Sequence, residues 1–219
     1  MHKGLGFLCA FLLFPTTFSF AQNGKVENIG PLVDKSVPDA VRQVLDAKGY
    51  HVMLDDGSVA CELWLRGTVP AQPKKDVQGA LYTRLAESTM VGVLHFPEAS
   101  TDYRGQPISA GFYSLRYELI PDDGNHLGAA PNRDFLLLIP VASDTDPNAA
   151  LKFQELVSLS RKATGTKHPG PLNLVQAESG PAAAVSKDDQ EHWIFSGGMK
   201  LSSGEEMPFA LVVKGTAQQ

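Results

Sequence analysis

The sequence predicts a mainly β protein, an antiparallel two-sheet β-sandwich with two peripheral helices. Eight or nine short strand patterns follow one another at fairly regular spacing, only two segments have helical periodicity, and no strand–helix–strand repeat occurs. No internal repeat and no shift in composition divides the chain. We therefore expect a single β-sandwich domain over residues 36–219.

The first predicted elements are a helix and a hairpin. An apolar stripe follows the N-cap residue Ser36 and ends before a glycine, which predicts a helix over 36–48. The next two segments alternate between apolar and polar residues on either side of Asp-Asp-Gly at 55–57, which predicts a β-hairpin over 50–65. Residues 67–79 contain two Pro, two Lys and no periodicity, so a long loop is expected there.

The middle of the chain is predicted to form four strands, at 82–86, 90–96, 112–120 and 135–141. The second of these is apolar on both faces, as in a central strand. In the third, Tyr and Leu alternate with Ser114, Arg116 and Glu118. This alternation predicts a strand with one buried face and one solvent-facing face.

The last part of the chain is predicted to contain one helix and several strands. Asp146-Pro147 opens the helix, which runs to about Ala163 and ends at Gly165. Residues 165–189 are rich in Gly, Pro, Ala and Ser and predict either a long crossing loop or a mobile excursion. Short strands are expected at 172–175, 193–195, 199–201 and 209–213, with a turn at Gly197-Gly198.

Residues 1–21 have the pattern of a secretory signal peptide. A basic start precedes an apolar run from Leu5 to Phe14, and the segment ends in the small-x-small site Ser19-Phe20-Ala21. An apolar run of about ten residues is too short to span a membrane, which takes roughly 20. We therefore expect export to the periplasm or out of the cell, followed by a flexible leader over 22–35.

The composition excludes several classes of protein. With 43% apolar and 20% charged residues, the chain is neither disordered, collagen-like nor a disulfide-stapled mini-protein. Without residues 1–21 it carries 18 basic and 24 acidic residues, which argues against a nucleic acid or an anionic membrane as partner. Only Cys61 remains, so no internal disulfide is expected, and no later segment predicts a membrane span.

One short segment resembles a motif of known exported proteins. Ala110-Gly111-Phe112-Tyr113-Ser114-Leu115 resembles the strand entry of many exported bacterial β-sandwich modules. Together with segments 61–64, 121–126 and 133–136, the chain looks like a group of uncharacterised exported bacterial proteins. The resemblance implies the fold and the compartment, and it implies no activity.

The best candidate site is the loop segment with Asp122, Asp123, Asn125 and His126. Carboxylate, amide and imidazole groups together suit a divalent cation. The same letters are also ordinary turn chemistry, in which side chains bond their own backbone. Arg133 and Asp134, just before the next strand, are expected to close on the same end as an ion pair.

Three kinds of isolated residue are better explained by packing. Cys61 shares a strand face with apolar residues, which predicts a buried, unreactive thiol. His95 is expected to be packed and hydrogen-bonded, whereas His51, His168 and His192 are expected at the surface. Trp64 is either a stacking platform for a ligand or covered by the first helix, and cover by the helix is favoured.

These patterns favour binding over catalysis. The motifs of zinc proteases, serine hydrolases, thiol redox enzymes, phosphate loops and dinucleotide sites are absent from the sequence. The leading hypothesis is an exported binding or structural interaction module that needs no cofactor, with an unknown ligand or protein partner. The alternative is a metal-dependent hydrolase-type enzyme, with Asp122, Asp123 and His126 as metal ligands or as acid and base.

Overall fold

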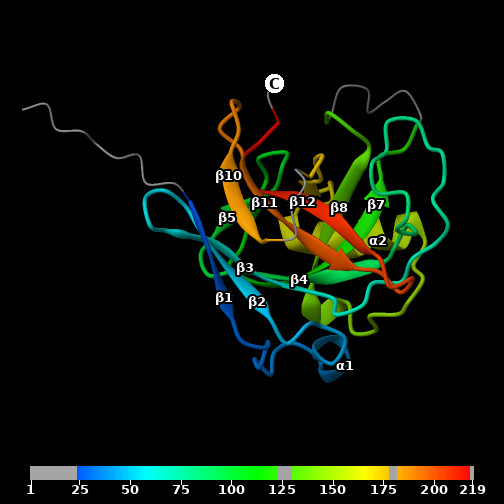
Figure 1. Cartoon of the computed structure of the whole chain (residues 1–219), viewed down its shortest axis with the longest axis horizontal. Helices are drawn as coiled ribbons and strands as arrows, with labels where there is room; N and C mark the ends of the chain where they lie inside the picture. Colours follow the sequence, from blue (N-terminus) through cyan, green and yellow to red (C-terminus); the bar gives the residue numbers. More distant parts are fainter. Residues whose placement is uncertain (1–23, 123–129, 178–181, 218–219) are drawn as a thin grey trace, which may run out of the picture.

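The computed structural model describes residues 24–122, 130–177 and 182–217, which form a mainly β fold (Figure 1). The strands are β1 (Lys25–Ile29), β2 (Gly49–Met53), β3 (Val59–Leu65), β4 (Met90–Phe96), β5 (Ser100–Thr101), β6 (Pro107–Ile108), β7 (Gly111–Leu119), β8 (Asp134–Pro140), β9 (Pro171–Asn173), β10 (Ala184–Lys187), β11 (Trp193–Lys200) and β12 (Glu206–Lys214). The helices are α1 (Asp39–Arg42), the 3-10 helix η1 (Val141–Ser143) and α2 (Phe153–Thr164).

Ten of the strands form two antiparallel sheets that nearly join. The large sheet has the order β1-β2-β3-β4-β7-β8-β9, and the small sheet has the order β10-β11-β12. A bridge between Leu174 and Leu211 links the β9 side of the large sheet to β12, and β1 lies beside β10 at the other edge. The predicted mainly β, antiparallel fold is confirmed. The strands are nearly barrel-shaped rather than divided into a clear two-sheet sandwich, because the edges of the two sheets meet.

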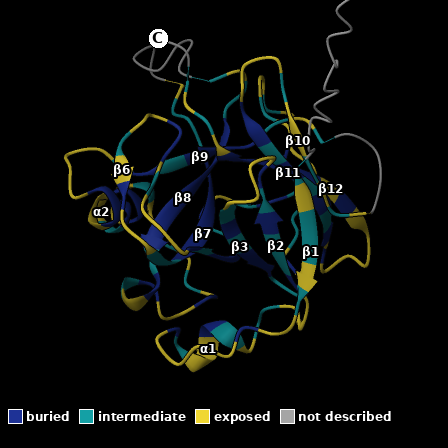
Figure 2. Cartoon of the chain, turned by 90° about the vertical axis from the view of Figure 1, so that its left-hand side faces the viewer, coloured by how far each residue is buried: buried dark blue, intermediate teal, exposed yellow. Residues whose placement is uncertain are grey.

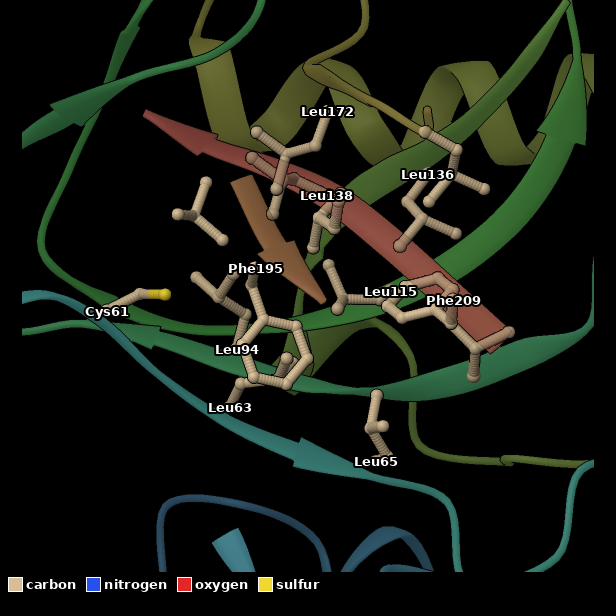
Figure 3. Close-up of a cluster of buried hydrophobic side chains, with 14 of the residues drawn as sticks. Cys61, Leu63, Leu65, Leu94, Leu115, Leu136, Leu138, Leu172, Phe195 and Phe209 are labelled. Atoms are coloured by element: carbon tan, nitrogen blue, oxygen red, sulfur yellow. The ribbon is translucent and has the colours of Figure 1, made fainter. Parts of the chain in front are cut away.

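Side chains from both sheets fill the interior. Phe195 and Phe209 of the small sheet lie among leucines of the large sheet, including Leu63, Leu94 and Leu115 (Figure 3). All five are fully buried. Burying one such side chain stabilises a fold by roughly 1.5–3 kcal/mol, so this cluster is a main source of stability.

The outer face of the large sheet is covered in two places (Figure 2). Near α1, Val37 and Val41 pack on Trp64, whose indole N–H donates to the carbonyl of Gly30 at 2.9 Å. On the other side, α2 covers Phe135 and its neighbours on β8. The prediction that the first helix region covers Trp64 is therefore confirmed.

Both helices are shorter than predicted, because tertiary hydrogen bonds take over their ends. The first ends at Arg42, not at 48, since the amide of Asp46 donates to Leu65 and the carbonyl of Val44 accepts from Gly67, each at 2.9 Å. The second begins at Phe153 rather than at Asp146-Pro147. The carbonyls of the preceding loop are instead bonded to a buried arginine that is described below.

The strand predictions fail where side chains or neighbouring strands decide the outcome. Residues 82–86 form a loop, because the carboxylate of Asp134 accepts the amides of Leu81 and Tyr82 at 2.6 and 2.9 Å. Gly197-Gly198 is no turn, since β11 pairs with β12 along its whole length. Four strands were not predicted: β5, β6 and β10, and β1 within the segment expected to be a leader.

Other local predictions are confirmed. The β2–β3 hairpin turns at Gly57, which has a φ of +80°, and the Asp56 carboxylate accepts the amide of Ser58 at 2.8 Å. Gly165 ends α2 in the left-handed conformation. In the ranges that the structure describes, no helix is long and apolar enough to cross a membrane. The predicted signal peptide, 1–21, lies outside these ranges.

Candidate functional site

The predicted site at 122–126 lies only partly within the described residues. Asp123, Asn125 and His126 are outside them. Asp122 is exposed, and its Oδ2 lies 4.0 Å from Nη1 of Arg133, whose Nε donates to the carbonyl of Ile120 at 2.9 Å. The two described members thus form a solvent-facing pair at the root of the loop. Such a pair contributes only about 0–1 kcal/mol.

A buried carboxyl group lies close to this loop root, near the end of β7. Glu118 is 3% exposed, and its Oε1 accepts the amide of Leu119 at 3.0 Å. Burial raises the pKa of Glu118 from 4.5 to about 7; the Leu119 hydrogen bond opposes this rise, and the carboxyl group of Glu87 adds to it. Glu118 therefore keeps its proton in mildly acidic solution.

Arg116 is also buried on β7, where the sequence predicts a solvent-facing residue. Its Nε and Nη2 donate to the two carboxylate oxygens of Asp144, each at 2.7 Å. Its remaining N–H groups donate to the carbonyls of Ser88, Asp146 and Ala149 at 2.6–2.8 Å. All five donors of the guanidinium are therefore used. We call this arrangement the Arg116 network, and it fastens the 144–149 segment onto the outer face of the sheet.

The prediction of a wet face on β7 is therefore wrong. Ser114 and Arg116 are fully inaccessible, and Glu118 is almost so. The Ser114 hydroxyl donates to Asp144 at 2.5 Å and completes the same network. Ser114 and Arg116 face a second layer of the protein rather than water, and that layer comes from a segment about 30 residues further along the chain.

Carboxylate and imidazole groups alternate across the outer face of the large sheet. Glu27, His51, Glu62 and His95 occupy directly opposed positions on β1 to β4. The His95 Nδ1 lies 2.9 Å from Glu62 Oε2, and its ring stacks on Phe112 at a centroid distance of 4.1 Å. The prediction of a packed, hydrogen-bonded His95 is confirmed.

His192 was predicted at the surface, and that prediction is wrong. It is 4% exposed, with Nδ1 3.0 Å from Asp188 and Nε2 2.9 Å from the carbonyl of Thr216. It ties a turn to the C-terminal segment, and both of its ring nitrogens are in use. His168 is exposed, as predicted.

The described ranges contain little that suits metal binding or thiol chemistry. No three His, Cys, Asp or Glu side chains there are grouped so that they could hold a metal ion. Cys61 is fully buried and free, and burial raises the pKa of its thiol far above the ordinary value. The prediction of a buried, unreactive cysteine agrees with this geometry.

A hollow of about 240 Å³ opens between the two sheets, where β3 ends and β2 begins. We call it the Tyr50 cleft. Its lining comes from the turn before β2, from the ends of β2 and β3, and from β11 and β12: Asp46, Lys48, Tyr50, Leu65, Arg66, Gly67, Gly198, Lys200 and Glu206. Pockets for drug-sized ligands have volumes of roughly 300–1,000 Å³, so this cleft suits a smaller molecule.

Tyr50 forms the aromatic wall of the cleft. Its ring packs on Phe195 of the small sheet at a centroid distance of 5.1 Å. The ammonium of Lys48 lies over the ring, 5.1 Å from its centre. Burial, with the charges of Asp46 and Glu206, raises the pKa of the Tyr50 hydroxyl. The hydroxyl therefore stays protonated at neutral pH and can donate a hydrogen bond.

Four exposed charged side chains line the same cleft as this ring, two of each sign: Lys48, Lys200, Asp46 and Glu206. Within the described part of the chain, none of the four has an oppositely charged group within 4.0 Å. The Asp46 carboxylate accepts the backbone amide of Lys48 at 2.8 Å, which orders the turn. The cleft therefore presents both signs of charge without internal ion pairs.

The fifth charged residue of the lining is already in use. Arg66 donates from Nη1 to the carbonyl of Pro147 at 3.0 Å and from Nη2 to the side chain of Asn148 at 2.6 Å. Burial and the nearby charge of Arg116 lower its pKa. Arg66 therefore stabilises the wall of the cleft, and Lys48 and Lys200 are the cations that remain available to a ligand.

Gly198 makes room for one of the carboxylates. A Cβ atom at this position would lie 2.2 Å from Oε1 of Glu206. The Glu206 carboxyl group thus rests over the glycine, and any larger residue at 198 displaces it. Nothing in the spacing of these residues predicts the cleft, because they are scattered from position 46 to position 206.

Comparisons with known proteins do not assign the chain to a family. No family model, no curated protein and no solved structure matches the chain.

Proposed function

We propose that this protein is an exported binding module that holds a small polar ligand in the Tyr50 cleft. The signal-type sequence of residues 1–21 supports a location in the periplasm or outside the cell. One observation carries the proposal of binding. Four charged side chains of both signs line a single hollow beside an aromatic ring, and they form no ion pairs with one another.

The cleft is suited to binding because its walls are fixed. The amide of Val69 donates to the carbonyl of Lys200, and the amide of Ser202 donates to Val69, each at 2.8 Å. These bonds hold the segment that follows β3 against the end of β11. A preformed site loses less entropy when a ligand binds. Hydrogen bonds to charged groups contribute about 1.5–3 kcal/mol each, enough for a few of them to bind a small molecule.

The test uses two glycine variants that differ in what a new side chain meets. Gly198→Ala pushes the Glu206 carboxylate out of place, whereas a Cβ at Gly30 has nothing within 4 Å. Melting temperatures are measured with millimolar free amino acids, monosaccharides and sugar acids. A ligand at a hundredfold excess over its Kd adds about 2.7 kcal/mol of stability. We expect a ligand-induced shift in the wild type and in Gly30→Ala, and none in Gly198→Ala.

Two results would contradict the proposal. One is the failure of every compound to shift the melting temperature. The other is a shift that is as large in Gly198→Ala as in the wild type, because the ligand would then bind elsewhere.

The alternative proposal is the metal-dependent hydrolase at Asp122, Asp123 and His126. Asp122 is exposed, and its Oδ2 lies 4.0 Å from Nη1 of Arg133, which a cation would have to displace. Protein purified without chelator would then carry stoichiometric metal, and His126→Ala would lose it. Absence of metal from both proteins would remove the metal-dependent form of this alternative.

A further inference from the structure

We infer that the ligand of the Tyr50 cleft is a zwitterion of amino-acid size, an inference that rests on the proposed function. Its carboxylate would lie against Lys48 and Lys200, and its ammonium against Asp46 and Glu206. The sign, number and placement of the charges carry this inference, together with the volume of the cleft.

The balance of charge selects the class of ligand. The four open side chains include two cations and two anions. A purely anionic ligand would satisfy the lysines but would face the two carboxylates. A neutral ligand would remove water from charged groups without replacing it by an opposite charge, which is costly. A zwitterion compensates both signs at once.

The placement of the charges agrees with this choice. Lys200 lies directly across from Glu206 in the β11–β12 pairing, so the two signs face the cleft from adjacent strands. Lys48 lies across the cleft from these strands, in the turn before β2, and its ammonium is placed over the ring of Tyr50. The protonated Tyr50 hydroxyl adds a donor for the carboxylate of the ligand.

The cations of the cleft and the volume of the cleft further restrict how the ligand is recognised and how large it can be. The fork of Arg66 is occupied by Pro147 and Asn148, so planar, two-point recognition of a carboxylate or phosphate by that residue is not available. Lysine ammonium groups act as point charges instead. A hollow of about 240 Å³ is small, which favours a single amino acid over a longer peptide.

The experiment is isothermal titration calorimetry of the full chain with glycine, L-alanine, L-serine, L-aspartate and L-lysine. The tightest binder is then compared with its carboxamide and its N-acetyl form, each of which lacks one charge. We expect each blocked form to bind at least about tenfold more weakly, since a charge-assisted bond is lost.

Two charge variants should each weaken one of these two preferences for the free amino acid. In Glu206→Gln, the preference for the free amino acid over its N-acetyl form should be clearly smaller than in the wild type, because the ammonium has lost one of its two partners. In Lys200→Met, the preference for the free amino acid over its carboxamide should be clearly smaller for the same reason. Glu98→Gln, an exposed residue outside the cleft, should behave as the wild type does.

The outcomes separate the two proposals. If the wild type binds the free and the blocked forms equally, the zwitterion is overturned and the binding module stands. The same holds if the protein binds glucose but no amino acid, and if Gly198→Ala loses the binding of glucose. If none of the five amino acids binds, the zwitterion is also overturned. If no compound binds in a Gly198-dependent way, the binding module itself fails.

Discussion

The Arg116 network and the Tyr50 cleft use charge in opposite ways. In the network, an inaccessible guanidinium has a partner for each of its five N–H groups. In the cleft, four exposed charges of both signs face a hollow without ion pairs among themselves. A charge whose partners are all supplied by the fold has a structural role. A charge that the fold positions but does not pair is available to a ligand.

The two regions are connected through Arg66. Arg116 holds the carbonyls of Asp146 and Ala149, and Arg66 bonds Pro147 and Asn148 between them. Arg66 also lines the cleft. The buried network therefore fixes a segment on which one wall of the cleft rests.

The largest expected effect comes from breaking the network. Arg116→Met or Asp144→Asn leaves a buried charge without its partner, which costs about 3–5 kcal/mol. Urea unfolding measures this loss. The matched control is Lys187→Met, which breaks the exposed pair with Glu191 and should leave the free energy of unfolding unchanged within error. A loss below about 1 kcal/mol for Asp144→Asn would show that the network is not structural.

Glu118 should give the second-largest effect, and it depends on pH. The folded chain keeps the Glu118 proton up to about pH 7, whereas the unfolded chain releases it near 4.5. The free energy of unfolding therefore falls as pH rises between these values, by at most about 3 kcal/mol from this group. Glu118→Gln keeps a neutral group at all pH values and should lack that fall.

The measurement is the difference between wild type and Glu118→Gln in urea unfolding at pH 4, 5, 6, 7 and 8. The difference removes the contribution of groups that titrate in both proteins, such as the histidines. A difference that stays constant from pH 4 to pH 8 would contradict a buried, protonated Glu118.

The smallest effects on stability should come from the cleft. Lys200→Met and Glu206→Gln are exposed substitutions without ion-pair partners, and they should change the free energy of unfolding by no more than about 0.5 kcal/mol. The same variants should lose most of the ligand affinity. A variant that loses stability like Asp144→Asn would show that the cleft charges support the fold rather than bind.

Much of the fold can be predicted from local sequence. Alternation locates β2, β3 and β7, an apolar run locates β8, and Gly165 marks the end of α2. Cys61 and Trp64 are assigned correctly to packed environments, because each shares a strand with apolar neighbours or has a helix segment near it. These features depend on residues close in sequence, which is why pattern reasoning succeeds.

The failures have a common physical cause. Ser114, Arg116 and Glu118 have the pattern of a wet strand face, yet all three are buried, and the 144–149 segment covers Ser114 and Arg116. The cleft joins residue 46 to residue 206, and neither spacing nor composition indicates such a meeting. Local patterns report which side of a strand is polar, but they do not report what covers it.

The roles of the two regions can be distinguished by the backbone amide shifts of the full chain during titration with the tightest-binding amino acid. If open charge marks the binding site, the amides of Gly67 and Gly198 in the cleft should move, while that of Asp144, bonded within η1 beside Arg116, stays in place. Shifts centred on the Arg116 network, with the amides of the cleft unmoved, would contradict the assignment of the two regions.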